Sequence, residues 1–310
     1  MDLFVTTLIA GFVQGTINAL LGAGLVAVYR GTRIINFAHG AMAMMATYIF
    51  VTLVDHKAPQ VIGFPLAAMV TAVLFAIVLG VAIDLMVMRP LARQSYLVRI
   101  IATLGVLYTL QSVALLLWGG ATRSVKPLFP RGGHQVGQIT VSNSDLGVAV
   151  FAFGIAIGLT LFYRYSRFGT AIRAVSNSRE AATLVGIRVN WVTAASWAIG
   201  GATGGIAGIL LAPSLALDSY ILTLLVISGL AAALTGRLES LGLALAGGIG
   251  LGVTTSLVVT YVGEWTLDHP QTWINLSHLD YAVALAWILG LLLIWKKPAT
   301  TQQQAGGLLL

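Results

Sequence analysis

The chain alternates between long apolar stretches and short polar connections. A helix needs about 20 mostly apolar residues to cross the hydrocarbon core of a bilayer. Nine such stretches occur along the 310 residues and are predicted to be membrane-spanning helices: 4–29, 34–54, 64–88, 97–118, 146–163, 191–212, 221–236, 241–262 and 279–295. The seventh is the shortest, which is typical of a re-entrant segment or of one half of a broken helix.

This pattern predicts an all-α fold, a polytopic transmembrane helix bundle with eight or nine membrane segments. The apolar runs are continuous and do not alternate with polar residues, which argues against a β-barrel. Hydrophobic residues make up 58% of the chain and charged residues only 9%, whereas charge is about a quarter of a soluble globular domain. One transmembrane domain is expected over residues 1–298, followed by a short, disordered tail at 299–310.

The charges predict how the bundle is oriented. Basic residues follow every odd-numbered segment, from Arg30 and Arg33 after the first to Lys296 and Lys297 after the ninth. Six of the ten acids lie in the opposite connections: Asp55, Asp145, Asp218, Glu264, Asp268 and Asp280. Because basic loops stay in the cytoplasm, the N-terminus is predicted outside and the C-terminus in the cytoplasm.

Two observations leave room for other arrangements. The connection 119–145 carries three basic residues on the predicted outer side (Arg123, Lys126 and Arg131), and Lys57 lies on that side as well. An eight-segment bundle, with 221–262 folded as a hairpin or as a broken element, is the main alternative.

The segment 164–190 is the most polar part of the chain. It holds one glutamate and five arginines: Arg164, Arg167, Arg173, Arg179 and Arg188. Ser178 is suited to cap the N-terminus of a helix, and the negative charge of Glu180 suits the positive end of the helix dipole. Gly186 is suited to end the helix. The pattern predicts a short helix at the cytoplasmic surface, exposed to a partner protein.

Asn36 and His39 open the second segment and, at a spacing of three, are expected to share a helix face. Polar side chains inside a membrane helix are costly and usually face a cavity or another helix. Two interpretations stay open. Both residues line a translocation path or gate, or Asn36 caps the segment while His39 hydrogen-bonds a neighbouring helix.

The sixth segment carries glycines at helical spacing, which predicts a flat ridge for close helix packing: Gly200, Gly201, Gly204, Gly205 and Gly208. The eighth segment carries a second set, expected to be the counterpart of this ridge: Gly247, Gly248, Gly250 and Gly252.

Residues suited to catalysis are scarce. The chain has no cysteine, and its five histidines show no metal-ligand spacing. No nucleotide-binding or serine-nucleophile motif occurs. Asp84 is the one acid well inside a span, and it is expected to pair with Arg89 or another arginine at the membrane surface. The chain is therefore not expected to be an enzyme or to hold a metal or cofactor, and its net charge of +7 marks topology, not nucleic-acid binding.

Two motifs resemble a known family. Glu180-Ala181-Ala182-Thr-Leu-Val-Gly186 is similar to the E-A-A-x-x-x-G core of the cytoplasmic coupling loop in permeases of ATP-binding-cassette (ABC) importers. Ile35-Asn-Phe-Ala-His-Gly40 resembles the entry to the second helix in the branched-chain amino-acid branch of these permeases. The resemblance extends over about residues 5–298. One departure is the turn 236–241, where the family usually has G-S-x-x-G and this chain has Arg237 and Glu239, expected to pair with each other or with the ATPase.

The resemblance implies a permease subunit of an ABC importer in the inner or plasma membrane of a prokaryote, translocating branched-chain or similar small amino acids. The implied partners are a second homologous permease, two cytoplasmic ATPase subunits, an extracytoplasmic binding protein and membrane lipid, with no nucleic acid. The implied coupling residues are Arg179, Glu180, Ala181, Ala182 and Gly186.

Three other functions stay open. The chain can be an ion-coupled secondary transporter of small organic solutes, an ABC permease for urea, amides or aromatic acids, or a membrane scaffold. An ion-coupled transporter needs charged residues deep in the membrane spans. A membrane scaffold leaves the short helix that begins at Glu180 without a role.

The predicted topology can be tested with single cysteines, because the chain has none of its own. Cysteines at Ser178 and Ser142 should show opposite accessibility to an impermeant thiol reagent. Equal labelling of both from outside the cell would contradict the nine-segment arrangement.

Overall fold

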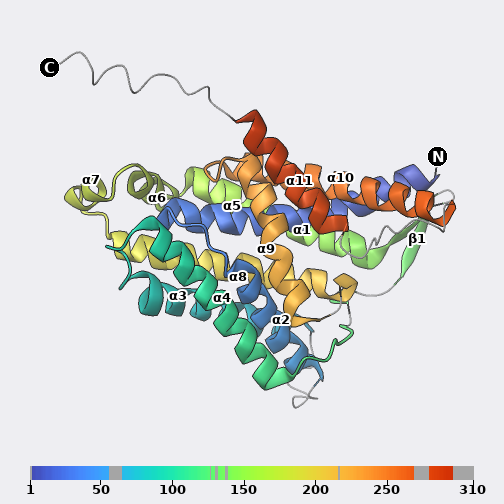
Figure 1. Cartoon of the computed structure of the whole chain (residues 1–310), viewed down its shortest axis with the longest axis horizontal. Coiled ribbons are helices and arrows are strands. Elements are labelled where there is room, and N and C mark those ends of the chain that lie inside the picture. The colour runs from blue at the N-terminus through green and yellow to red at the C-terminus, as the bar shows by residue number, and fades with distance from the viewer. Residues whose placement is uncertain are drawn as a thin grey trace.

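The computed structural model describes residues 2–55, 65–125, 127–129, 132–136, 139–215, 217–268 and 279–295. The fold is a bundle of apolar helices (Figure 1): α1 (Asp2–Thr32), α2 (His39–Asp55), α3 (Pro65–Ile83), α4 (Tyr96–Trp118), α5 (Asn143–Tyr165), α8 (Val189–Leu215), α9 (Ser219–Thr235), α10 (Leu241–Asp268) and α11 (Leu279–Ile294). A π-helical turn, η1 (Asp84–Met88), extends α3. The predicted polytopic helical bundle is therefore confirmed.

Each of the nine predicted segments coincides with one of these helices. By length and composition, six are long and apolar enough to cross a membrane, and α2, α9 and α11 are shorter apolar helices. The seventh segment is a continuous helix of 17 residues, so no break divides it. The number of membrane crossings stays a prediction, and the predicted tail 299–310 lies outside the described residues.

The second segment begins later than predicted. Residues 34–36 are not helical, and α2 starts only at His39. Arg33 adopts a left-handed conformation with φ of 58°, and the Thr32 hydroxyl accepts a hydrogen bond from the backbone N–H of Ile34 at 3.3 Å. These two features end α1 sharply. The prediction that Asn36 and His39 share a helix face was therefore wrong, since Asn36 precedes the helix.

Several small elements were not predicted. The connection between α4 and α5 holds an antiparallel hairpin of β1 (Gly133–Val136) and β2 (Ile139–Ser142), in which Gly133 pairs with Ser142. The polar segment after α5 forms two helices, α6 (Arg167–Asn177) and α7 (Arg179–Leu184), where the sequence indicated only the second.

Helix α8 lies against α1, α2 and α3, and its glycines allow the close approach. A Cβ at Gly201 would collide with the carbonyl of Ala76 on α3, and a Cβ at Gly208 would lie 2.8 Å from the carbonyl oxygen of Ala43 on α2. The ridge therefore meets two helices, and Gly205 lies between them, against Ala46 of α2 and Ala76 of α3. In a membrane, where apolar burial gives little drive for association, such close packing is a main source of cohesion.

The glycines of α10 are not the counterpart of this ridge, contrary to the prediction. A Cβ at Gly248 would collide with the backbone of Ala19 on α1, and one at Gly252 with the backbone of Gly15. Hence α1 and α10 form their own seam, in which small residues of each helix meet. The α8 ridge does not take part in it.

Large apolar side chains cover the outside of the bundle. Val78, Leu116, Val150 and Leu293 are 65–85% exposed, and they come from α3, α4, α5 and α11. A surface of this kind is costly in water and suits contact with lipid. The chain is thus a multi-pass membrane protein.

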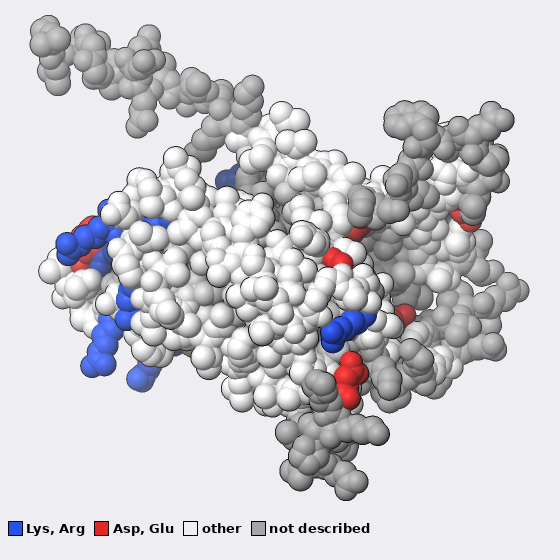
Figure 2. Space-filling view, turned by 60° about the horizontal axis from the view of Figure 1, so that its bottom comes forward, with Lys and Arg blue, Asp and Glu red and all other residues white. Residues whose placement is uncertain are grey.

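The charged residues separate toward the two ends of the bundle. Lys and Arg gather at one end, seen at the left of Figure 2, and most of the visible acids lie toward the other. At the first end, called the basic end here, Arg33 on the α1–α2 connection contacts α6 and the α9–α10 turn. At the opposite end, Arg123 pairs with Leu217 through backbone hydrogen bonds. Successive apolar helices therefore run in alternating directions.

Gly201→Ala should destabilise the protein, because the added methyl group meets backbone of α3 that cannot move aside. Overpacking of this kind costs about 1–3 kcal/mol. Gly158→Ala in α5 is the matched control, since nothing lies within 4 Å of a Cβ there. It should be neutral or stabilising by about 0.5–1 kcal/mol. Thermal unfolding in detergent measures both, and equal midpoints would contradict the seam.

Candidate functional site

The segment after α5 is a pair of capped helices at the basic end. The Ser166 hydroxyl accepts a hydrogen bond from the N–H of Gly169 at 3.0 Å and caps α6. The Ser178 hydroxyl accepts one from the N–H of Ala181 at 3.1 Å and caps α7, which confirms the predicted start of that helix. Because the two helices are separated by one residue, the segment folds into a sharp corner.

Gly186 ends α7 in the way that its position suggested. Its φ is +82°, its N–H donates to the carbonyl of Thr183 at 3.0 Å, and the N–H of Ile187 donates to the carbonyl of Ala182 at 3.0 Å. This pair of hydrogen bonds is a Schellman motif, which needs a left-handed residue after the helix. The turn therefore requires glycine or a residue that tolerates positive φ.

The two sides of α7 have different surroundings. Leu184 and Val185 are 88% and 74% exposed, while Ala182 is 2% exposed and packs into the bundle. Glu180 is exposed as well. The surface that α7 offers to a partner is thus Glu180, Ala181 and the apolar tip Leu184–Val185. Of the two alanines of α7, only Ala181 belongs to this surface.

Arginine side chains fasten α6 and α7 to the end of α1. Arg33 donates to the carbonyl of Ser176 through Nε at 3.1 Å and through Nη2 at 2.7 Å. Arg179 donates to the carbonyl of Gly31 at 3.4 Å. Arg173 donates to the carbonyl of Tyr163 at 2.8 Å. A displacement of α6 and α7 would therefore pull directly on α1 and α5.

The α9–α10 turn joins the same cluster. Glu239 forms an ion pair with Arg33 at 3.0 Å, whereas Arg237 lies over the ring of Trp295, 5.2 Å from its centroid. Of the two expected alternatives, the pairing of Arg237 with Glu239 was therefore wrong, and contact with the ATPase stays a prediction. Burial acts to lower the pKa of Arg33, but hydrogen bonds to Glu239 and Tyr29 outweigh it and leave the pKa raised.

His39 lies in a closed seam between α1, α2 and α8. Asn36 lies just before α2, and both residues are fully buried. A Cβ at Gly24 of α1 would lie 2.7 Å from Cε1 of His39, and one at Gly204 of α8 would lie 3.2 Å from it. Glycines of two helices thus form a socket for the imidazole ring. The spacing of the α8 glycines suggested a packing ridge, but not that the ridge houses His39.

The polar atoms in this seam are poorly satisfied. The carbonyl of Leu21 lies near His39, yet neither ring nitrogen makes a hydrogen bond of sound geometry to any described residue. The amide nitrogen of Asn36 donates to the sulfur of Met42 at 3.6 Å, and its Oδ1 finds no partner in the described chain. Buried polar groups without partners are rare and call for an explanation.

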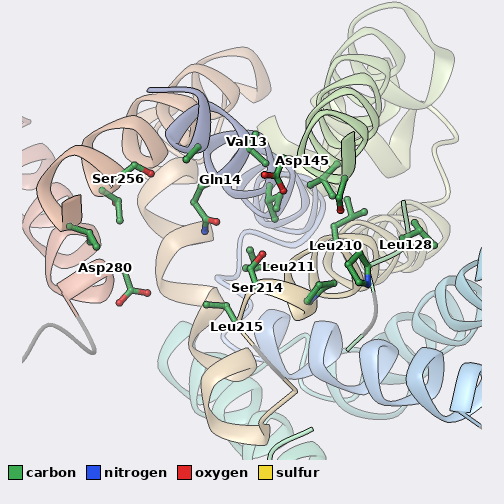
Figure 3. A pocket seen from close by; sticks show the side chains of 18 of the residues that line it. Val13, Gln14, Leu128, Asp145, Leu210, Leu211, Ser214, Leu215, Ser256 and Asp280 are labelled. Carbon is green, nitrogen blue, oxygen red and sulfur yellow. The ribbon is translucent and has the colours of Figure 1, made fainter. Parts of the chain in front are cut away.

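A cavity of about 530 Å³ opens at the end opposite α7, between α1, α5, α8, α10 and α11. Figure 3 shows Gln14 and Ser214 turned into it, with Asp145 and Asp280 on opposite sides. Its wall combines apolar side chains with amide, hydroxyl and carboxylate groups, which suits a small polar organic molecule or one that carries an amine. Neither Asn36 nor His39 lines it.

No group of three or more possible metal ligands occurs among the residues described, where the search covered His, Cys, Asp and Glu. What the arrangement offers is a fastened, protruding helix at one end and a polar cavity at the other.

Comparisons with known proteins decide the family. The sequence model of the family described as "Branched-chain amino acid transport system / permease component" matches residues 7–294. The chain belongs to this family. It is 27% identical over 270 residues to the high-affinity branched-chain amino acid transport system permease protein LivH of Salmonella typhimurium, covering 84% of this chain and 87% of the relative.

Other relatives agree. BraD of Pseudomonas aeruginosa, a permease protein of the same description, is 28% identical over 86% of this chain and 89% of its own length. The structure of PsaBC from Streptococcus pneumoniae in complex with Fab matches with a TM-score of 0.51 over 99% of this chain and 96% of that chain. At 14% identity, this likeness concerns the fold alone. Both relatives are described as permease proteins, and this chain belongs to the same permease family.

Replacing the buried polar groups tests whether the seam serves transport. Asn36→Leu and His39→Leu should lower uptake while yield and thermal stability are kept, because the one hydrogen bond described for this pair is the weak contact of Asn36 with the sulfur of Met42. Purified protein and uptake into reconstituted vesicles give the two readouts. Loss of assembly in both variants would instead assign the pair to helix packing.

Proposed function

We propose that this chain is the membrane-spanning permease subunit of an ABC importer that carries branched-chain or similar small amino acids. Membership of the permease family supports the class of protein, and the relatives, which are described as branched-chain amino acid permeases, support the substrate. The main support for the mechanism is the structure of α7. It is a short, capped helix at the basic end, and its apolar tip is exposed.

An ATPase docks at α7 in this proposal. Leu184 and Val185 are too exposed to stabilise the isolated chain, and burial of one such side chain in a partner groove contributes about 1.5–3 kcal/mol. The chain has no nucleotide-binding motif of its own, so the energy for transport comes from this partner. A second permease subunit completes the membrane pore.

The basic end faces the cytoplasm, in keeping with the distribution of arginines. The polar cavity then opens on the extracytoplasmic side, where a binding protein releases the substrate. Its acids can attract the ammonium group of an amino acid, and its apolar residues can accept the aliphatic side chain. Transport coupled to an ion gradient has less support, since the one buried carboxylate among the described residues, Asp84, is paired with Arg89.

Variants at Leu184, Glu180 and Gly186 test whether α7 is the docking helix. Leu184→Asp should weaken binding of the ATPase about tenfold or more, as expected for the loss of one buried apolar side chain. Leu184→Met should not. Glu180→Lys, made separately, should also weaken docking of the ATPase, because it reverses the charge at the N-terminus of α7.

Gly186→Val should uncouple ATP hydrolysis from substrate, because a β-branched residue is strongly disfavoured at a φ of +82°. Gly186→Asn tolerates this conformation and is the matched control. Co-purification of the ATPase and substrate-stimulated ATP hydrolysis are the measurements. Wild-type values in Leu184→Asp and Gly186→Val together would show that α7 is not the docking element.

A further inference from the structure

A carboxylate lies buried in the apolar bundle beside α7. Asp84 is 2% exposed and begins η1, where α3 widens into a π-helical turn. An ionised group inside a membrane helix is expensive, and π-helical turns occur frequently at functional sites. Both features indicate that Asp84 has a role beyond closing the helix.

The contacts of Asp84 join α3 to α8. Nε of Arg89 lies 3.4 Å from Oδ2 of Asp84, and the hydroxyl of Thr193 on α8 donates to the same oxygen at 3.4 Å. Arg89 also donates to the carbonyl of Asn190 at 3.1 Å. The carboxylate thus draws the start of α8 and the end of α3 together.

A small void beside Asp84 brings in α7 and α4. It measures about 30 Å³, about the size of one water molecule. Besides Asp84 and Arg89, its lining includes Arg99 of α4 and Arg179, the first residue of α7. Three arginines therefore line the same void as this carboxylate, and one of them, Arg89, contacts it.

Arg179 lines this void and is not part of the exposed surface that α7 offers to an ATPase. It donates to the carbonyl of Gly31 on α1, while the neighbouring Glu180 is exposed. Burial lowers the pKa of Arg179, nearby Arg99 acts in the same direction, and Asp84 opposes both. Asp84 therefore interacts electrostatically with Arg179, the first residue of α7.

We propose that Asp84 is a positioning residue for coupling, whose carboxylate holds Arg179 and so ties the base of α7 to α3 and α8. Without it, Arg89, Arg99 and Arg179 repel one another in a half-buried space, where charge interactions are stronger than in water. A displacement of α7 by the ATPase then passes through Arg179 and Asp84 into the transmembrane helices. This inference rests on the proposed function, since it assigns a path to the same coupling contact.

The first experiment measures coupling in the assembled importer with its ATPase and binding protein. Asp84→Asn and Arg179→Gln should each reduce substrate-stimulated ATP hydrolysis about fivefold or more, within the ordinary range of coupling between sites. The ATPase should still co-purify, because the exposed tip of α7 is unchanged. Asp84→Glu keeps the charge and should restore part of the stimulation.

A double-mutant cycle tests whether Asp84 acts through Arg179. The variant with both Asp84→Asn and Arg179→Gln should be no worse than either single variant, since both remove one interaction. Glu264→Gln is the control, because it removes an exposed carboxylate near the end of α10, outside the cluster around α7, and should keep full stimulation. Additive losses, or wild-type stimulation in Asp84→Asn, would overturn the proposal.

A second measurement needs no ATPase. A spin label on a cysteine at Thr183, which is exposed on α7, should be more mobile in Asp84→Asn than in the otherwise wild-type chain. Unchanged mobility would contradict the role of Asp84 as an anchor. Failure of the proposed function looks different: the wild-type chain would then show no ATPase stimulation, whatever residue 84 is.

Discussion

The bundle depends on the close contact of α8 with three other helices. A membrane protein cannot rely on apolar burial between its helices, because lipid solvates the same surfaces, so backbones must approach closely enough for dispersion to act. Gly201 meets α3, Gly208 meets α2, and Gly204 borders the ring of His39. Because these contacts involve backbone atoms, α8 fixes the positions of α2 and α3 with little tolerance, and the remaining helices surround this core.

This arrangement has a consequence for motion. Helix α8 begins at the basic end, directly after α7, and ends at the cavity on the opposite side. A rigid helix that reaches both sites can carry a displacement from one to the other.

The buried seam around His39 adds a polar element to this contact. The ring and the Asn36 amide are enclosed between apolar helices with few partners, an arrangement that a purely structural core would avoid. The same residues lie where the chain leaves α1 and enters α2. Arg33, at that bend, also holds the end of α6. The fastening of the docking segment and the polar seam thus meet within one short stretch of chain.

Local physics explains what could be predicted from the sequence alone. The apolar length of each segment is enough to place nine helices, and their basic ends follow from charge. Ser178 and Gly186 bound α7 because a cap and a left-handed turn need only neighbouring residues. A similar signal existed for α6, in Ser166 followed by Phe168, Ile172 and Val175 at helical spacing, although the prediction did not use it.

Other features were decided only by contacts between distant segments. Arg179 and Ala182 turn inward while Leu184 turns outward, because the bundle covers one side of α7. The α10 glycines meet α1 and not α8, since helical spacing shows which residues form a ridge but not which helix receives it. The sequence therefore determined the nine apolar helices, their order and their charged ends, and the tertiary structure decided which faces meet and which arginines share the void beside Asp84.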